Sequence, residues 1–348
     1  MLNDYSIKTI NPNDSAAISR IDALLSREGI HRDTNLDYIC AIVDSMGKFI
    51  ATGSCFQNTL RCFAVDSLHQ GEGLLADLLL HLVHVQFDRG NTNLFLYTKP
   101  DAARLFSALG FYEIARVENT LVFMENRKNG FSNYLKKLEK SKKTASSAAI
   151  VMNANPFTLG HQYLVETASK IYDCVHVFVL SEDCSFFPFE IRKKLVTLGC
   201  AHLSNVFIHE SGPYMISNAT FPSYFIKDRD DVIWAQAMLD AAIFCQIAER
   251  LNISARFVGE EPKSHVTKLY NKLLSSTLPN YGIRCNIIPR KKAGNSPISA
   301  SDVRLCLQRN DFSALHSLVP DSTYCYLTSP AAQPVISKIK NSESVIHY

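Results

Sequence analysis

A short stretch near the middle of the chain, NANPFTLGH, groups residues that can bind an anion. It begins at Asn153, after the apolar run AAIVM and before an amphipathic segment. Pro156 fixes one backbone angle, and Gly160 lets the main chain approach a ligand closely. Thr158 offers a hydroxyl and His161 a ring N–H at the start of a predicted helix, whose free N–H groups favour an anion. The stretch predicts a cradle for a triphosphate, although a lone histidine at a helix start is more often an ordinary capping residue.

A second stretch with phosphate-binding chemistry, PISASDVR, lies nearer the C-terminal end. Ser299 and Ser301 open a predicted helix, where hydroxyl and main-chain N–H groups can bind phosphates. Arg304 follows about one turn later, and its guanidinium can hold two oxygens. Ser299 and Asp302 are also spaced for a simple helix cap, and the two roles are compatible.

Two other segments carry charges that suit a nucleotide. In FPFEIRKKL (187–195), Arg192 lies in the first turns of a predicted helix, where a cation opposes the helix dipole, so we expect a phosphate partner for it. In FVGEEP (257–262), two carboxylates end a predicted strand. They could meet a ribose or a Mg²⁺ ion, or cap the next turn, and the sequence leaves these alternatives open.

The elements that must position these groups alternate regularly between residues 148 and 328. Five apolar strands are separated by helical segments, which predicts a parallel sheet with helices on both faces. Ligands of such sheets bind beyond the carboxyl ends of the strands, where NPFTLGH lies. After residue 328 the pattern is weak, and we expect a loosely ordered tail.

The first part of the chain, up to residue 126, has the pattern of a mixed α/β domain. Gln70, Gly71, Glu72 and Gly73 precede an apolar helix and could turn main-chain N–H groups toward a phosphate. Residues 127–147 contain many Lys and Arg and a single acid, Glu139. This basic segment is interpreted as a solvated linker, with a docking patch for an acidic partner as the alternative.

Composition excludes several classes of protein. The net charge of +3 is too small for a dedicated nucleic-acid binder. No signal peptide is apparent, and no apolar run approaches the roughly 18 residues of a membrane span. Ten scattered cysteines without a C-x-x-C pair indicate reduced thiols. We therefore expect a cytoplasmic protein that binds neither nucleic acid nor membrane.

The two phosphate-binding stretches resemble known signatures. Thr158 to His161 resembles the H/T-x-G-H signature of the nucleotidyltransferase superfamily, and Ile298 to Arg304 resembles its I-S-x-S/T-x-x-R signature. Nearly the whole chain resembles the acetate:SH-citrate lyase ligase family, on IVMNANPFTLGHQYLVE, SEDCSFFPFEIR, ISNATFPSYFIKD, RFVGEEP and PISASDVR. In the first part, QGEGL and YTKPDAARLFSALGFYEI resemble a GNAT acetyltransferase domain.

The resemblance implies a fold and an activity. It implies a GNAT-like α/β domain at 1–126, the basic linker at 127–147, a Rossmann-like parallel-sheet nucleotidyltransferase (cytidylyltransferase-like) domain at 148–328, and a tail at 329–348. It also implies that ATP and Mg²⁺ are used to convert acetate to acetyl-AMP. The acetyl group would then pass to the prosthetic-group thiol of the acyl carrier (gamma) subunit of citrate lyase.

The resemblance also implies residue roles. The catalytic residues would be His161, Thr158 and Arg304. The ATP-binding residues would be Asn155, Pro156, Thr158, Gly160, His161, Arg192, Ser299, Ser301 and Arg304. Gln70, Gly71 and Gly73 could form a coenzyme A or pantetheine loop, and no protein ligand for a metal is assigned. Phe221, Tyr224 and Lys227 could surround the acyl group or thiol arm, or could equally be core and surface residues.

Two other functions are compatible with these motifs. An adenylyltransferase could act on a phosphate substrate such as phosphopantetheine or nicotinamide mononucleotide. A non-catalytic module could sense acyl-CoA through residues 59–125.

Overall fold

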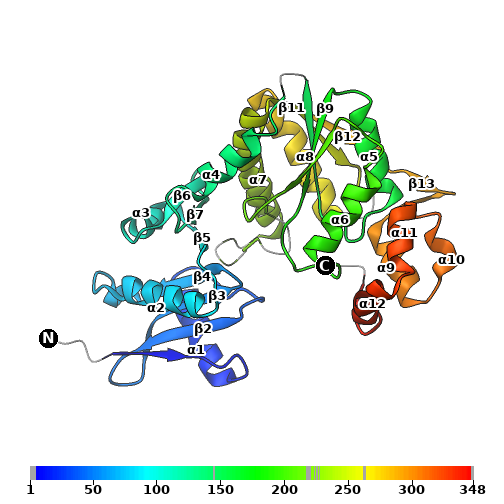
Figure 1. Ribbon diagram of the computed structural model, residues 1–348. Helices are drawn as coiled ribbons and strands as arrows, with labels where there is room; N and C mark the ends of the chain where they lie inside the picture. Colours follow the sequence, from blue (N-terminus) through cyan, green and yellow to red (C-terminus); the bar gives the residue numbers. More distant parts are fainter. Residues whose placement is uncertain are drawn as a thin grey trace. The chain divides into compact units, whose positions relative to one another are not determined.

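The chain divides into two compact units in the computed structural model (Figure 1). Met1–Gly130 and Pro222–Ala235 form the first unit, and Phe131–Phe221 and Gln236–Tyr348 form the second. The finer domain boundaries expected from the sequence stay predictions. The structure describes residues 5–143, 146–216, 221–222, 224, 226, 228–261 and 264–345.

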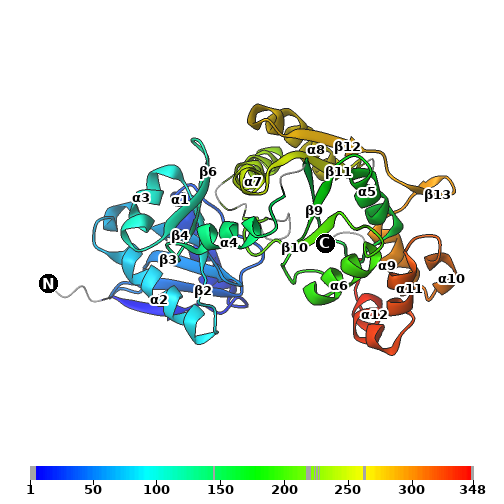
Figure 2. The ribbon, with the colours of Figure 1, turned by 45° about the horizontal axis from the view of Figure 1, so that its top comes forward.

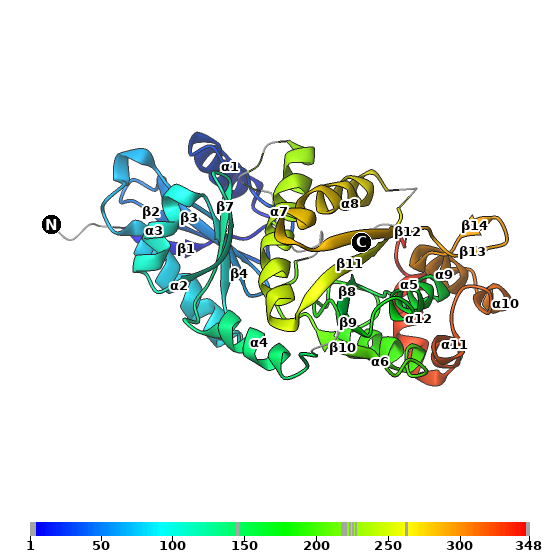
Figure 3. The same ribbon diagram turned by 90° about the horizontal axis from the view of Figure 1, so that it is seen from above.

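The first unit is built on a seven-stranded sheet with the order β1-β2-β3-β4-β5-β7-β6. Its strands are β1 (Ser6–Thr9), β2 (Tyr38–Val43), β3 (Phe49–Phe56), β4 (Thr59–Val65), β5 (Phe95–Thr98), β6 (Tyr112–Val117) and β7 (Leu121–Glu125). Its helices include α1 (Ser15–Arg27), η1 (Ser67–His69), α2 (Leu74–Asp88) and α3 (Pro100–Ala108). Neighbouring strands are antiparallel except β4 and β5, which are parallel and pair only at Thr59–Phe95 and Leu60–Leu96. Strands β1 to β4 and helices α1 to α3 are labelled in Figure 3.

The second unit contains a five-stranded parallel sheet with the order β10-β9-β8-β11-β12 (Figure 2). The strands are β8 (Ser147–Met152), β9 (Cys174–Val179), β10 (Val206–Glu210), β11 (Ile253–Gly259) and β12 (Arg284–Ile288). The helices are α4 (Gly130–Glu139), α5 (Leu159–Ser169), α6 (Phe189–Gly199), α7 (Arg229–Leu251), which begins in the first unit, and α8 (His265–Thr277), followed by η2 (Leu278–Tyr281). The central strand is β8, and the strand order reverses there, so a ligand crevice is expected at its carboxyl end.

A mostly helical region follows the sheet in the chain. It consists of the hairpin β13 (Lys292–Ala293) and β14 (Ser296–Pro297), then α9 (Ala300–Gln308), α10 (Phe312–Leu315), α11 (Asp321–Leu327), η3 (Pro330–Ala332) and α12 (Gln333–Lys340). Val335, Ile336 and Ile339 of α12 are buried in one cluster with Phe186 and Phe187. The prediction of a loosely ordered tail is therefore wrong. The sequence analysis missed α12 because it has only eight residues and a proline, Pro334, in its first turn.

The expected α/β fold is confirmed, because both units combine a sheet with helices and the second sheet is parallel throughout. All six residues of β9 are buried, as in a strand covered on both faces. In α7, Asp230–Leu251 are long and apolar enough to cross a membrane, which the sequence analysis missed. About 61% of its most apolar window is buried inside the structure, as expected for a core helix of a soluble protein.

A pair of histidines, one buried and one partly buried, joins β9 to the edge strand β10. Nδ1 of His176 lies 2.9 Å from Nε2 of His209, and the Cys174 thiol lies 3.4 Å from Nε2 of His176. His176 is fully buried. Burial lowers the pKa of both histidines to about 4, helped by the charge of Lys143 at His176 and by His176 at His209. Both rings are therefore neutral at pH 7.

We expect this pair to make the protein less stable in acid. The unfolded histidines bind protons near pH 6.5 and the folded ones near pH 4, so the free energy of unfolding falls as the pH drops through this window. Between pH 7 and pH 5 the loss is roughly 2 kcal/mol for each histidine. Urea unfolding followed by circular dichroism should show that a His176→Gln, His209→Gln double variant loses less free energy of unfolding between pH 7 and pH 5 than the wild type. Exposed His84→Gln is the control, and equal losses in the double variant and the wild type would contradict the expectation.

Candidate active site

The stretch NANPFTLGH leaves the central strand β8 as a tightly held loop. Ala154 has a positive φ of 53°, and the Asn155–Pro156 peptide bond is cis. Phe157 is buried against Gly199 of α6, where a Cβ atom would lie only 2.3 Å from the phenyl ring. The backbone of this loop is therefore fixed by packing before α5 begins.

Thr158 and His161 hold one another at the start of α5. The main-chain N–H of His161 donates to Thr158 Oγ1 (3.3 Å), and the Thr158 N–H donates to Nδ1 of His161 (3.1 Å). Thr158 Oγ1 also lies 2.9 Å from Nδ1 and is almost completely buried. Thr158 thus caps the helix and orients the imidazole, whereas the sequence suggested a hydroxyl offered to phosphate.

The hydrogen bonds of His161 determine which ring nitrogen carries the proton. Because Nδ1 accepts a bond from a main-chain N–H, the proton of the neutral ring lies on Nε2. Burial, and secondarily the charge of Arg290, lowers the pKa of His161 to about 4. At neutral pH His161 is therefore an uncharged donor through Nε2–H.

Arg192 occupies a different environment from the one its sequence position suggested. It is fully buried, and its guanidinium donates to the main-chain oxygens of Phe187 (2.9 Å), Asn153 (2.9 Å), Leu180 (2.8 Å) and Glu182. It also donates to Oδ1 of Asn153 at 2.8 Å. These bonds clamp the loops that follow β8 and β9, and a phosphate contact for Arg192 stays a prediction.

Arg304 is also held by main-chain oxygens. Its Nη1 donates to the Asn155 carbonyl at 2.5 Å and its Nε to the Val345 carbonyl at 2.7 Å. Its Nη2 donates to Ser301 Oγ at 3.0 Å. The side chain is 4% exposed, so it joins the loop of the first signature to the helix of the second instead of projecting into an open site.

The two signatures meet at the starts of α5 and α9. The Ile298 carbonyl lies 3.4 Å from the position of a Cβ atom on Gly160, so a larger residue there would crowd the junction. Ser299 caps α9 by accepting from the Asp302 N–H (3.1 Å) and donating to the Asp302 carboxylate (2.7 Å). The helix cap suggested by the sequence is therefore present. The side chain of Asn155 accepts from the Phe187 N–H at 3.2 Å.

Arg290 is a residue of this region that the sequence analysis missed. It follows β12 by two residues and pairs with the Glu261 carboxylate. It also donates to the carbonyls of Glu260 (2.7 Å) and Ile298 (3.3 Å). Its place just beyond the end of a parallel strand was the signal that could have identified it.

Other predicted residues lie in the first unit or outside the described residues. Gly71 and Gly73 have positive φ angles and leave open space where a Cβ would be, so the loop with Gln70 is accessible before α2. Tyr224 is buried in the core of the first unit, and its hydroxyl donates to the Tyr97 carbonyl at 2.5 Å. Phe221 is buried, and Lys227 lies outside the described residues.

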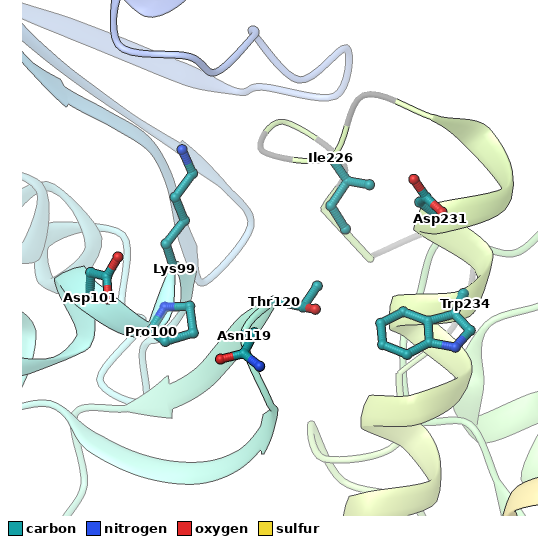
Figure 4. Close-up of a pocket in the computed structure, with 8 residues that line it drawn as sticks. All are labelled: Lys99, Pro100, Asp101, Asn119, Thr120, Ile226, Asp231 and Trp234. Atoms are coloured by element: carbon teal, nitrogen blue, oxygen red, sulfur yellow. The ribbon is translucent and has the colours of Figure 1, made fainter.

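In the part of the chain that the structure describes, neither a metal cluster nor the cavity shown in Figure 4 coincides with the signatures. Among the described residues, no group of three or more His, Cys, Asp or Glu side chains could hold a metal ion. An open cavity of about 460 Å³ belongs to the first unit (Figure 4). It is lined by Lys99, Pro100, Asp101, Asn119, Thr120, Ile226, Asp231 and Trp234.

Known proteins resemble both the sequence and the parts of this structure. Residues 147–327 match the family model described as the citrate lyase ligase C-terminal domain. The citrate (pro-3S)-lyase ligase of Klebsiella pneumoniae is 36% identical over 313 residues, 88% of this chain and 91% of that protein. The one from Escherichia coli K12 is 35% identical over 325 residues, 91% of this chain and 92% of that protein.

Among solved structures, a GNAT-family N-acetyltransferase from Escherichia coli, in complex with CoA, is 18% identical to this chain. The match covers 37% of this chain and 85% of that chain, with a TM-score of 0.29.

Because the family model matches more than half of the chain and the two ligases align along about nine-tenths of it, the chain belongs to the citrate lyase ligase family.

Proposed function

We propose that this protein is an ATP-dependent ligase that acetylates the acyl carrier subunit of citrate lyase. In the first step an acetate oxygen attacks the α-phosphorus of ATP, and the bond to pyrophosphate breaks to give acetyl-AMP. In the second step the prosthetic-group thiol of the carrier attacks the acetyl carbon. The thioester forms, AMP leaves, and the thiol gives up its proton.

The observation that carries this proposal is the neutral, oriented imidazole of His161 at the junction of the two signatures. A hydrogen-bond donor held in a fixed place can stabilise negative charge that develops on the phosphate during attack, without reorganising. Adenylation needs alignment and charge stabilisation more than covalent chemistry from the protein. The relatives named as citrate lyase ligases support acetate and the carrier subunit as substrates.

The remaining site residues either contact the phosphates of ATP or hold the residues that do. We propose that the phosphates of ATP lie against Gly160, His161 and the start of α9 with Ser299 and Ser301. Thr158 acts through His161. Asn155, Pro156, Arg192 and Arg304 then serve ATP binding by holding the loop in place.

Mg²⁺ is proposed to enter with the nucleotide. Glu261, one of the two carboxylates of FVGEEP, is paired with Arg290, so the phosphate oxygens would supply most of the ligands. When bound, the ion would neutralise charge on the phosphates. We also propose a cytoplasmic location, and a phosphate-binding role for the Gln70–Gly73 loop toward a coenzyme A or pantetheine group.

His161 provides the direct test of this proposal. His161→Ala should lower acetate-dependent exchange of pyrophosphate into ATP by about 100-fold or more, because a fixed donor to developing charge is lost. His161→Gln should retain part of the activity, since its amide N–H can replace Nε2–H. Circular dichroism would confirm that both variants fold. Wild-type exchange in His161→Ala, or exchange in the wild type that does not need acetate, would contradict the assignment.

Thr158 offers a second test through a pair of variants. Thr158→Val removes the oxygen that caps α5 and contacts the imidazole, so exchange should fall about tenfold and stability by about 1 kcal/mol. Thr158→Ser keeps that oxygen and should behave nearly as the wild type. The measurements are initial exchange rates and urea unfolding. Equal activity of the two variants would show that the hydroxyl does not position His161.

A further inference from the structure

Of the three arginines around the two signatures, Arg290 has the most exposed side chain. Arg192 and Arg304 are 0% and 4% exposed, and main-chain oxygens accept most of their bonds. The side chain of Arg290 is 26% exposed and that of its partner Glu261 is 15% exposed. An ion pair with this exposure can exchange one partner for another at small cost, because water screens both states.

The position of Arg290 is defined by its hydrogen bonds. Nε donates to the Glu260 carbonyl, Nη1 to the Ile298 carbonyl and Nη2 to the Glu261 carboxylate. These bonds to described residues use three of the five N–H donors of a guanidinium. The bond from Nη1 is the longest of the three, at 3.3 Å, so the guanidinium is held mainly through Nε and the ion pair with Glu261.

Arg290 lies close to the first turn of α5. The Ile298 carbonyl that accepts from Nη1 is the same carbonyl that lies 3.4 Å from the Cβ position of Gly160. The charge of Arg290 contributes, after burial, to the low pKa of His161. The guanidinium is therefore one carbonyl group away from the two residues that begin the proposed phosphate site.

The charge balance of the site indicates what Arg290 can bind. In their bonds to described residues the other two guanidinium groups donate mostly to main-chain oxygens, whereas Arg290 is more exposed and pairs with a carboxylate, a partner that a phosphate can replace. We propose that Arg290 binds the β- and γ-phosphates of ATP, leaving Glu261 when the nucleotide arrives. This inference rests on the proposed function and adds a residue to it. A guanidinium can bind two phosphate oxygens through parallel hydrogen bonds. Carboxylate and phosphate groups suit the same donor geometry, so one can replace the other.

The test compares nucleotides that differ in the proposed contact. ATP and AMP would be titrated separately into full-length protein with Mg²⁺ in a calorimeter, without acetate. Arg290→Gln should weaken ATP binding about tenfold or more, as expected for a lost charge-assisted hydrogen bond, and change AMP binding less than about twofold. Lys292→Gln removes a charge from the exposed hairpin that follows and should leave both affinities unchanged.

Glu261→Gln tests the exchange of partners without removing the arginine. If Glu261 competes with phosphate for Arg290, ATP should bind as tightly as in the wild type or more tightly. If Glu261 instead serves the nucleotide or its metal, ATP binding should weaken, which would overturn the inference. Arg290→Lys keeps the positive charge but lacks the paired N–H donors of the guanidinium, so its affinity for ATP should be intermediate. This variant also serves as the test if Arg290→Gln fails to fold.

The outcomes separate this inference from the proposed function. Equal weakening of ATP and AMP by Arg290→Gln would mean a structural effect and would overturn the role of Arg290. Wild-type affinity for ATP in Arg290→Gln would do the same while leaving the ligase function intact. Failure of the wild type to bind ATP would overturn both.

Discussion

The hydrogen bond from Arg304 to the Asn155 carbonyl is the contact on which the candidate site depends. The loop after β8 has left the sheet, so its carbonyl groups need partners from elsewhere in the fold. Arg304 supplies one for Asn155, and Arg192 supplies one for Asn153. The two arginines thus fix both ends of a three-residue turn. With that turn fixed, Thr158 can cap α5 and His161 can take one orientation.

Using arginines in this way has an electrostatic consequence. A buried guanidinium is costly unless oxygen atoms surround it, and carbonyl groups satisfy that requirement without a neutralising carboxylate. Arg192 and Arg304 therefore keep their positive charge close to the loop but do not expose it. Together with the helix starts at α5 and α9, they make the region favourable for an anion while a neutral imidazole provides the oriented donor.

The sequence predicted the strand-to-helix junctions better than the bonds that bring them together. The parallel strands and the junctions at Gly160 and Ser299 follow from local patterns of apolar residues, glycine and helix caps. The roles of Arg192 and Arg304 depend on the geometry of distant segments, since Arg304 and Asn155 are 149 residues apart in the chain. The spacing of residues within one segment cannot indicate a bond between residues so far apart in the chain. Arg290 escaped notice for the same reason, because its partners come from the segment that follows β11 and from the segment before α9.

The first unit shows a structural role for Tyr224, which lies outside the nucleotide signatures. Strands β4 and β5 pair at only two positions, and Tyr97 lies beyond them. Tyr224, from the stretch ISNATFPSYFIKD, inserts its ring into the core there and donates its hydroxyl to the Tyr97 carbonyl, while the His31 N–H donates to the Tyr224 carbonyl at 2.8 Å. A buried phenol needs such a partner, and the carbonyl needs a donor that β4 does not supply. The identity of residue 224 is therefore constrained by packing near β4 and β5, which lie more than a hundred residues earlier in the chain.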